Sequence, residues 1–82
     1  MIMYVVYILE SGKSGHYYIG QTDNLEKRIR EHNLGKSKST KSGIPWSLIY
    51  KEIYETRKDA IRREKDLKRK KKRRAIETLI AG

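Results

Sequence analysis

The chain has 82 residues, which suits one small domain with a single modest core. It contains no cysteine, which excludes disulfides and thiolate metal sites, and no apolar run approaches the roughly 20 residues of a membrane-spanning helix. Lysine and arginine number 20 against 10 acidic residues, and the resulting net charge of +10 favours a polyanionic partner, most often nucleic acid. A charge that serves only solubility is the simpler alternative.

The first half of the chain predicts a β-hairpin followed by a helix. Residues 3–10 and 16–22 are rich in valine, isoleucine and tyrosine, and the turn residues SGKSG separate them. Asp23 and Glu26 have the spacing of a capping box that opens a helix. The helix is expected to run to about Asn33, because Gly35 is a natural stop.

The second half predicts a third strand and two helices. A basic Ser/Lys/Thr/Gly loop over 36–43 precedes a strand over 46–54, in which Trp46, Leu48 and Tyr50 alternate with Ser47, Ile49 and Lys51. Thr56 with Asp59 marks the start of a helix to about Arg69. A short final helix, within 72–80, is expected to pack three apolar residues: Ile76, Leu79 and Ile80.

The resulting order is β-β-α-β-α with a final helix. It predicts an α/β (α+β) fold, with a three-stranded, mostly antiparallel sheet flanked by helices. No repeat or long linker divides the sequence. We therefore expect a single domain over residues 1–82 with a basic C-terminal segment at 68–82.

Two tyrosines in the hairpin have two interpretations. Tyr7 alternates with Val6 and Ile8, and so lies on the opposite face of its strand. Tyr18 shares a face with Gly20, which is expected to leave open space beside it. Each tyrosine alone is ordinary core, but their hydroxyl groups need partners when buried, so a site is the alternative.

The two helices add polar residues beside these strands. Arg28 and His32 are four residues apart and stack on one side of the first helix, where they are expected to project along the edge of the sheet. Glu64 lies on the same face of the second helix as Ala60, Ile61 and Leu67. A carboxylate in an apolar stripe is costly unless it is paired, so an internal salt bridge and a metal-binding or catalytic carboxylate are both open.

Together these residues resemble the GIY-YIG nuclease domain over most of the chain. The two motifs of that family correspond to Val5-Val6-Tyr7 and Tyr18-Ile19-Gly20. Arg28 and His32 stand where the family has its arginine and histidine, and Glu64 matches its metal-binding glutamate. The first motif glycine is replaced by Val5. The short chain is most similar to stand-alone single-domain bacterial members.

The resemblance implies a DNA endonuclease that hydrolyses a phosphodiester with one Mg²⁺ or Mn²⁺ ion, with structure-directed or weakly sequence-specific cleavage in DNA repair or recombination. It gives catalytic roles to Tyr7, Tyr18, Arg28, His32 and Glu64, with Glu64 as the metal ligand. Seven basic residues are expected to bind the nucleic acid backbone: Lys36, Lys38, Lys41, Lys68, Arg69, Lys70 and Lys71.

Two alternatives to the endonuclease stay open at this point. A nucleic-acid-binding module with vestigial or partner-dependent catalysis fits the charge and the lost glycine. A protein partner would then supply specificity, and RNA would be an alternative ligand. A basic adaptor for an acidic protein is supported by charge alone and leaves Glu64 unexplained. No signal-peptide pattern opens the sequence, so a cytoplasmic protein without membrane contact is expected.

Overall fold

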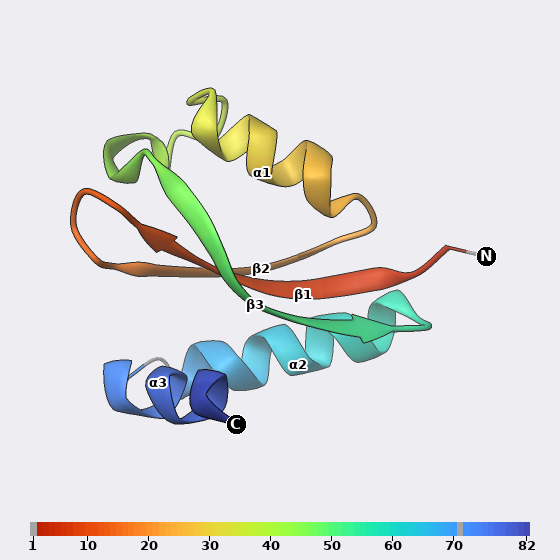
Figure 1. Ribbon diagram of the computed structural model, residues 1–82. Coiled ribbons are helices and arrows are strands. Elements are labelled where there is room, and N and C mark those ends of the chain that lie inside the picture. Colours follow the sequence, from red (N-terminus) through yellow and green to blue (C-terminus); the bar gives the residue numbers. More distant parts are fainter. Residues whose placement is uncertain (1, 71) are drawn as a thin grey trace.

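The computed structural model describes residues 2–70 and 72–82 and has one sheet between helices (Figure 1). The elements are β1 (Tyr4–Ser11), β2 (Tyr17–Thr22), α1 (Leu25–Asn33), a 3₁₀ turn η1 (Lys41–Gly43), β3 (Trp46–Tyr54), α2 (Arg57–Arg69) and α3 (Arg73–Ala81). This order confirms the predicted fold class. In the described residues, no helix combines the length and apolar character needed to cross a bilayer.

The sheet has the order β2-β1-β3, with both neighbours antiparallel to the central strand. Tyr7 lies opposite Gly20 on β2 and opposite Lys51 on β3. The pairing of β1 with β3 shifts between Ile8 and Leu9, so that Ile49 has no partner in the register. This bulge makes the predicted simple alternation of β3 wrong, because one extra residue reverses which face the following side chains occupy.

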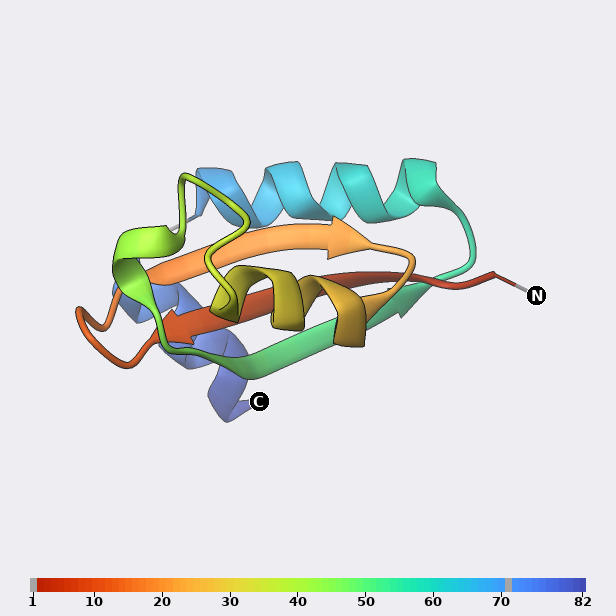
Figure 2. The ribbon, with the colours of Figure 1, turned by 90° about the horizontal axis from the view of Figure 1, so that it is seen from above.

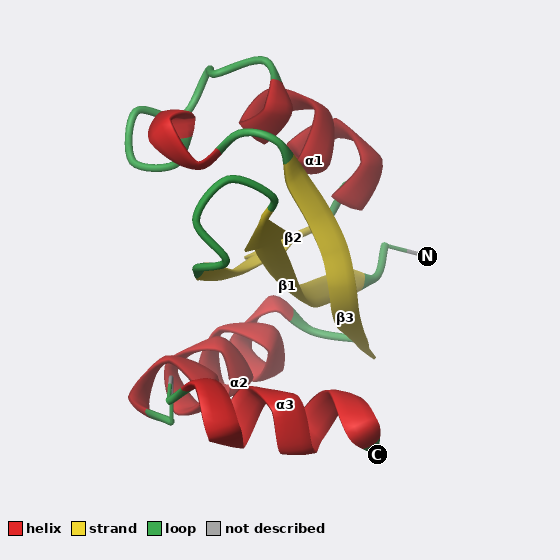
Figure 3. Cartoon of the chain, turned by 60° about the vertical axis from the view of Figure 1, so that its left-hand side comes forward, coloured by secondary structure: helices red, strands yellow, loops and turns green. Residues whose placement is uncertain are grey.

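Helices cover both faces of the sheet, as Figures 1 and 3 show. On the face toward α2 and α3, a buried apolar cluster joins Val6, Ile8 and Ile19 to residues of both helices: Ala60, Leu67 and Ile76. On the face toward α1, Tyr7, Leu9 and Trp46 form a second cluster. Seen from above, α1 lies in front of the strands and α2 runs along the edge of the sheet next to β2 (Figure 2). The central strand is therefore buried from both sides.

Capping residues explain where the helices begin. The side chain of Asn24, rather than Asp23, caps α1 by accepting a hydrogen bond from the backbone N–H of Lys27 at 3.2 Å. The predicted capping box is thus wrong by one residue, which two adjacent cap-forming side chains made ambiguous. The Thr56 hydroxyl caps α2 as predicted, by accepting from the N–H of Asp59 at 3.2 Å.

The final helix buries less than predicted. Ile76 is 1% exposed and Leu79 is partly buried against the apolar cluster, but Ile80 is 39% exposed. The prediction for Ile80 was wrong because a single-layer contact buries only one side of a short helix.

An ionic network connects β3 to α2. The Glu52 carboxylate accepts hydrogen bonds from Arg63 at 2.9 and 3.0 Å and from the hydroxyl groups of Tyr50 and Tyr54. Burial by itself raises the pKa of Glu52, but Arg63 and the two hydroxyl groups lower that pKa to about 2. The carboxylate therefore stays ionised at neutral pH and stabilises the packing of α2 on the sheet.

Candidate active site

Tyr7 sits at the centre of the molecule and packs directly on glycine. Its side chain is 1% exposed, and a Cβ added at Gly20 would lie 2.7 Å from the Tyr7 hydroxyl oxygen and 3.1 Å from the Tyr18 ring. The expected open space beside Gly20 is therefore filled by the phenol of the neighbouring strand. Gly20 is needed because any larger residue would displace the two tyrosines.

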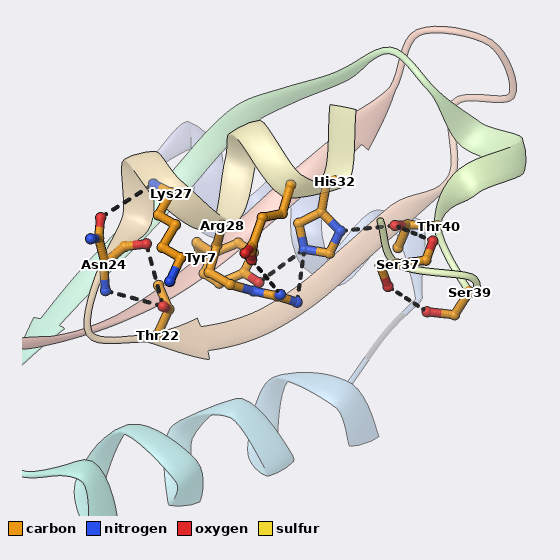
Figure 4. A network of polar contacts seen from close by, with 10 residues as sticks. Tyr7, Thr22, Asn24, Lys27, Arg28, His32, Ser37, Ser39 and Thr40 are labelled. Atoms are coloured by element: carbon orange, nitrogen blue, oxygen red, sulfur yellow. Dashed lines mark hydrogen bonds and ion pairs between the residues drawn. The ribbon is translucent and has the colours of Figure 1, made fainter. Parts of the chain in front are cut away.

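A hydrogen-bonded chain connects Tyr7 to the loop after α1 (Figure 4). The Tyr7 hydroxyl lies 3.2 Å from His32 Nε2, and His32 Nδ1 lies 2.8 Å from Thr40 Oγ1. The Thr40 hydroxyl in turn donates to the Ser37 carbonyl at 3.4 Å. Since that hydroxyl uses its proton there, it accepts from His32 Nδ1–H, which leaves Nε2 as the acceptor for Tyr7.

His32 is completely buried, and so the prediction that it projects along the edge of the sheet was wrong. It is 0% exposed and both ring nitrogens have partners. Burial, followed by the positive charge of Arg28, lowers the pKa of His32 below its ordinary value of 6.5. The imidazole is therefore neutral at pH 7 and able to accept a proton.

Arg28 connects this cluster to solvent. Its Nη2 lies 3.5 Å from His32 Nε2, and its Nη1 donates to Glu31 at 2.9 Å. The Arg28 side chain is 35% exposed, unlike that of His32. A guanidinium held by a neighbouring carboxylate yet open to solvent is suited to bind phosphate oxygens.

Tyr18 stands between the cluster and the start of β3. Its ring centroid lies 4.7 Å from that of His32, 6.2 Å from that of Tyr7 and 6.3 Å from that of Trp46. The Tyr18 ring is tilted against the rings of Tyr7 and His32 and meets Trp46 in a T-shaped arrangement. The half-buried Tyr18 is thus fixed in position beside both Tyr7 and His32.

Glu64 approaches from α2. Its side chain is 19% exposed and forms an ion pair with Lys68 one turn later, so the internal salt bridge expected as an alternative is present. Its charge is also close enough to raise the pKa of Tyr7. The two interpretations of Glu64 are therefore compatible, because an ammonium group and a divalent cation are alternative partners for the same carboxylate.

The phenol of Tyr7 is kept neutral by its surroundings. Burial raises the pKa of Tyr7 to about 12, and the Arg28 guanidinium opposes that rise. Loss of the Tyr7 proton would therefore need an acceptor within hydrogen-bonding distance, and His32 Nε2 is that acceptor.

The predicted backbone-binding residues fall into two groups. Lys36, Lys38 and Lys41 are exposed around the loop after α1. On α2 and its C-cap, the cations have acidic partners: Lys68 pairs with Glu64, while Arg69 and Lys70 pair with Asp66. Lys71 lies outside the described residues. The three cations themselves are 49–78% exposed in these pairs, so their side chains stay accessible to phosphate.

The sequence did not predict the role of Thr40. This residue is 2% exposed, orients the His32 imidazole, and accepts the Trp46 indole N–H on its carbonyl at 2.8 Å. It lies in a stretch of small polar residues that is typical of a solvent-exposed loop. Nothing in its spacing from other residues distinguishes Thr40 from the polar residues beside it.

Comparison with known proteins identifies the class to which a protein with this fold and this cluster belongs. The family model of the GIY-YIG catalytic domain matches residues 3–77, and the chain belongs to this nuclease family. Particular relatives are single-domain bacterial UPF0213 proteins. The one from Bacillus licheniformis is 43% identical over 75 residues, covering 87% of this chain and 76% of the relative. The one from Staphylococcus saprophyticus is 32% identical and covers 100% of both chains.

A solved structure agrees with the fold. The solution NMR structure of a UPF0213 protein from Bacillus halodurans has a TM-score of 0.61 and 32% sequence identity. The similarity covers 98% of this chain and 84% of that one. The arrangement of three antiparallel strands and three helices is thus shared with a relative.

Proposed function

We propose that this protein is a cytoplasmic, metal-dependent endonuclease that hydrolyses a DNA phosphodiester with structure-directed or weakly sequence-specific cleavage. The observation that carries the proposal is the hydrogen-bonded contact of the buried Tyr7 phenol with a neutral, buried His32 beside a partly exposed Arg28. Of these three groups, Tyr7 lies close enough to the Glu64 carboxylate for that charge to raise its pKa. Membership of the GIY-YIG family supports this assignment.

In this proposal, Arg28 binds the non-bridging oxygens of the scissile phosphate. Its guanidinium is partly exposed and fixed by Glu31, so it meets the phosphate with little reorganisation. Tyr18 positions the attacking water beside Tyr7, since its ring lies next to both Tyr7 and His32.

Proton transfer follows the hydrogen-bonded chain. As the water oxygen bonds to phosphorus, a water proton passes to the Tyr7 oxygen and the phenol proton passes to His32 Nε2. The bond from phosphorus to the 3′ oxygen breaks, and that oxygen takes a proton from solvent, which leaves a 5′-phosphate and a 3′-hydroxyl. His32 then returns its extra proton to Tyr7 as the phenol releases one to solvent, which restores the starting state. The relay avoids a free phenolate, which the pKa of about 12 makes costly.

The carboxylate of Glu64 fits one Mg²⁺ or Mn²⁺ ion. Mg²⁺ commonly takes one or two carboxylates together with substrate phosphate and water, and Glu64 provides one hard oxygen ligand. The described residues contain no group of three His, Asp or Glu side chains that would form a closed metal cage. When bound, the ion would stabilise the negative charge that develops on the phosphate.

The basic surface is proposed to bind the DNA backbone without reading its sequence. Lys36, Lys38 and Lys41 are exposed, and contacts with phosphate add affinity but little sequence choice. Cleavage that depends on DNA shape fits the processing of branched intermediates in repair or recombination.

A second candidate is a nucleic-acid-binding module whose catalysis requires a protein partner. The observation that favours it is the ion pair of Lys68 with Glu64, which occupies the proposed metal ligand in the isolated chain. Under this candidate the protein binds DNA in a salt-dependent manner, with RNA as an alternative ligand, but cleaves neither alone.

The deciding experiment is a cleavage assay on labelled duplex, flap, branched and single-stranded DNA with Mg²⁺ or Mn²⁺. Glu64→Gln is expected to lower the rate about 10³-fold, because the metal supplies several kcal/mol of charge stabilisation. The matched control is Glu55→Gln, which removes an exposed carboxylate between β3 and α2 and should cleave normally. Undiminished cleavage by Glu64→Gln would contradict the proposal, and salt-dependent binding without turnover would favour the second candidate.

A further inference from the structure

A second hollow lies beside the catalytic cluster. It has a volume of about 820 Å³ and is bounded by the end of the hairpin, the loop between α1 and β3, and the first residue of α3. This volume falls within the range typical of pockets that enclose small organic ligands. Its lining includes none of Tyr7, Arg28 and Glu64, so it is a separate compartment.

The hollow shares two walls with the catalytic cluster. Tyr18 lines it and also lies 4.7 Å from the His32 ring, measured between centroids. Thr40 lines it and also holds His32 Nδ1 at 2.8 Å. A strand whose phosphate reached Arg28 and Tyr7 would therefore place a neighbouring nucleotide at the entrance of the hollow.

Aromatic surfaces form much of the wall. Tyr17, Tyr18 and Trp46 all line the hollow. The Trp46 indole is only 8% exposed and is held rigidly, because its N–H donates to the Thr40 carbonyl at 2.8 Å and the Gly43 backbone packs directly against its ring. The half-buried rings of Tyr17 and Tyr18 are therefore the more accessible aromatic surfaces. Rigid aromatic rings in a recess bind a planar group by stacking with little loss of conformational entropy.

The charged group in the wall is positive. Arg73 lies with its guanidinium carbon 5.3 Å from the Tyr17 ring centroid, and donates to the Gly15 carbonyl at 3.0 Å. Arg73 also pairs with Glu10 at 3.7 Å and with Glu77 at 3.1 Å, but its side chain is still 60% exposed and can meet a phosphate. His16 and several serine hydroxyl groups complete the polar lining, and no carboxylate takes part in it. The wall therefore combines stacking surfaces with a group that attracts phosphate.

We propose that this hollow receives one unpaired nucleotide of the DNA substrate, next to the scissile phosphate. This inference rests on the proposed function. The base stacks on the aromatic wall and its phosphate meets Arg73. A paired base already has both faces covered by its neighbours, so only a nucleotide outside a duplex can use these surfaces. The hollow would thus select DNA with a single-stranded segment beside the cleavage position.

The test measures binding without turnover, with the unaltered protein in EDTA. Two DNAs of one duplex sequence carry 2-aminopurine either in a one-nucleotide overhang or at a paired position. We expect roughly tenfold tighter binding of the overhang DNA, and quenching of its fluorescence by stacking. Equal affinity for the two DNAs, with no quenching, would overturn the inference, and this comparison depends on no variant.

A variant that fills the hollow tests whether the preference for overhang DNA arises there. Ser42 is exposed and lines the hollow, and Ser42→Trp is expected to fill it and abolish the preference for the overhang. Thr78→Trp adds the same side chain on an exposed face of α3 outside the hollow, and should keep the preference. Retained preference in Ser42→Trp would contradict the assignment.

These assays distinguish a failure of the proposed endonuclease function from a failure of the proposed nucleotide pocket. Cleavage that depends on Glu64 but shows no preference for an overhang would leave the proposed function intact and exclude the nucleotide pocket. Absence of DNA binding at any salt concentration would contradict both.

Discussion

Both faces of the sheet are covered by helices, but they differ in chemistry. The face toward α2 and α3 buries Val6, Ile8 and Ile19 among apolar side chains. The face toward α1 buries Tyr7 together with two polar residues, His32 and Thr40, that are 0% and 2% exposed. Burying polar groups is costly unless each finds a partner, and in the described residues every buried side-chain nitrogen and oxygen has one.

Along this single strand, the apolar core is therefore separated from the cluster of Tyr7, His32 and Thr40. Tyr7 and Ile8 are adjacent in β1, yet they point to opposite faces and belong to different clusters. Substitutions at these two positions should therefore affect different properties of the protein.

The largest effect is expected for Tyr7→Phe. This change keeps the ring but removes the hydroxyl group that donates to His32 Nε2. Without the relay, kcat/KM for DNA cleavage should fall by about 10²–10⁴-fold, while the free energy of unfolding changes by about 1 kcal/mol. Steady-state cleavage and urea unfolding measure the two quantities. A loss of stability that accounts for the whole loss of activity would contradict the division between the faces.

A smaller effect, on stability alone, is expected for Ile8→Val. Ile8 is 0% exposed in the apolar cluster, and loss of one methylene group there should lower the free energy of unfolding by about 0.5–1.5 kcal/mol. The rate of cleavage below the unfolding transition should match that of the unaltered protein, since the Ile8 side chain belongs to the apolar cluster and not to the cluster that contains Tyr7. A selective fall in cleavage would show that the two faces are coupled.

The smallest effect is expected from pH. Burial lowers the pKa of His32 in the folded state, so the unfolded chain binds a proton near pH 6.5 that the folded protein does not. The stability contributed by neutral His32 is thus complete above about pH 6.5 and is lost as pH falls. Urea unfolding between pH 7.5 and 5.5 should show a decline of at most about 1.4 kcal/mol per pH unit from this group. His32→Asn should have a shallower slope, and an unchanged slope would exclude His32 as its source.

Several features were predictable because local rules decide them. The strands over β1 and β3 follow from β-branched and aromatic runs, and the start of α2 follows from the Thr56 cap. The candidate catalytic residues came from family motifs, and the structure brings Tyr7, Tyr18, Arg28 and His32 into one cluster.

Other features depend on contacts between distant segments. The bulge at Ile49 arises where β3 pairs with β1, and the contact between Gly20 and Tyr7 arises where β2 pairs with β1. The two adjacent cap formers before α1 were equivalent in sequence, and only the folded backbone selected Asn24.

By itself, the sequence determined the order of strands and helices and the residue types of the site, because propensity, capping and periodicity act over a few neighbouring residues. Only the tertiary structure decided that His32 is buried, that Thr40 orients it, and that a hollow of about 820 Å³ adjoins Tyr18. Those properties arise from contacts across the fold: the α1–β3 loop packs over a sheet whose strands come from both halves of the chain, and desolvation and hydrogen bonding are fixed at that contact.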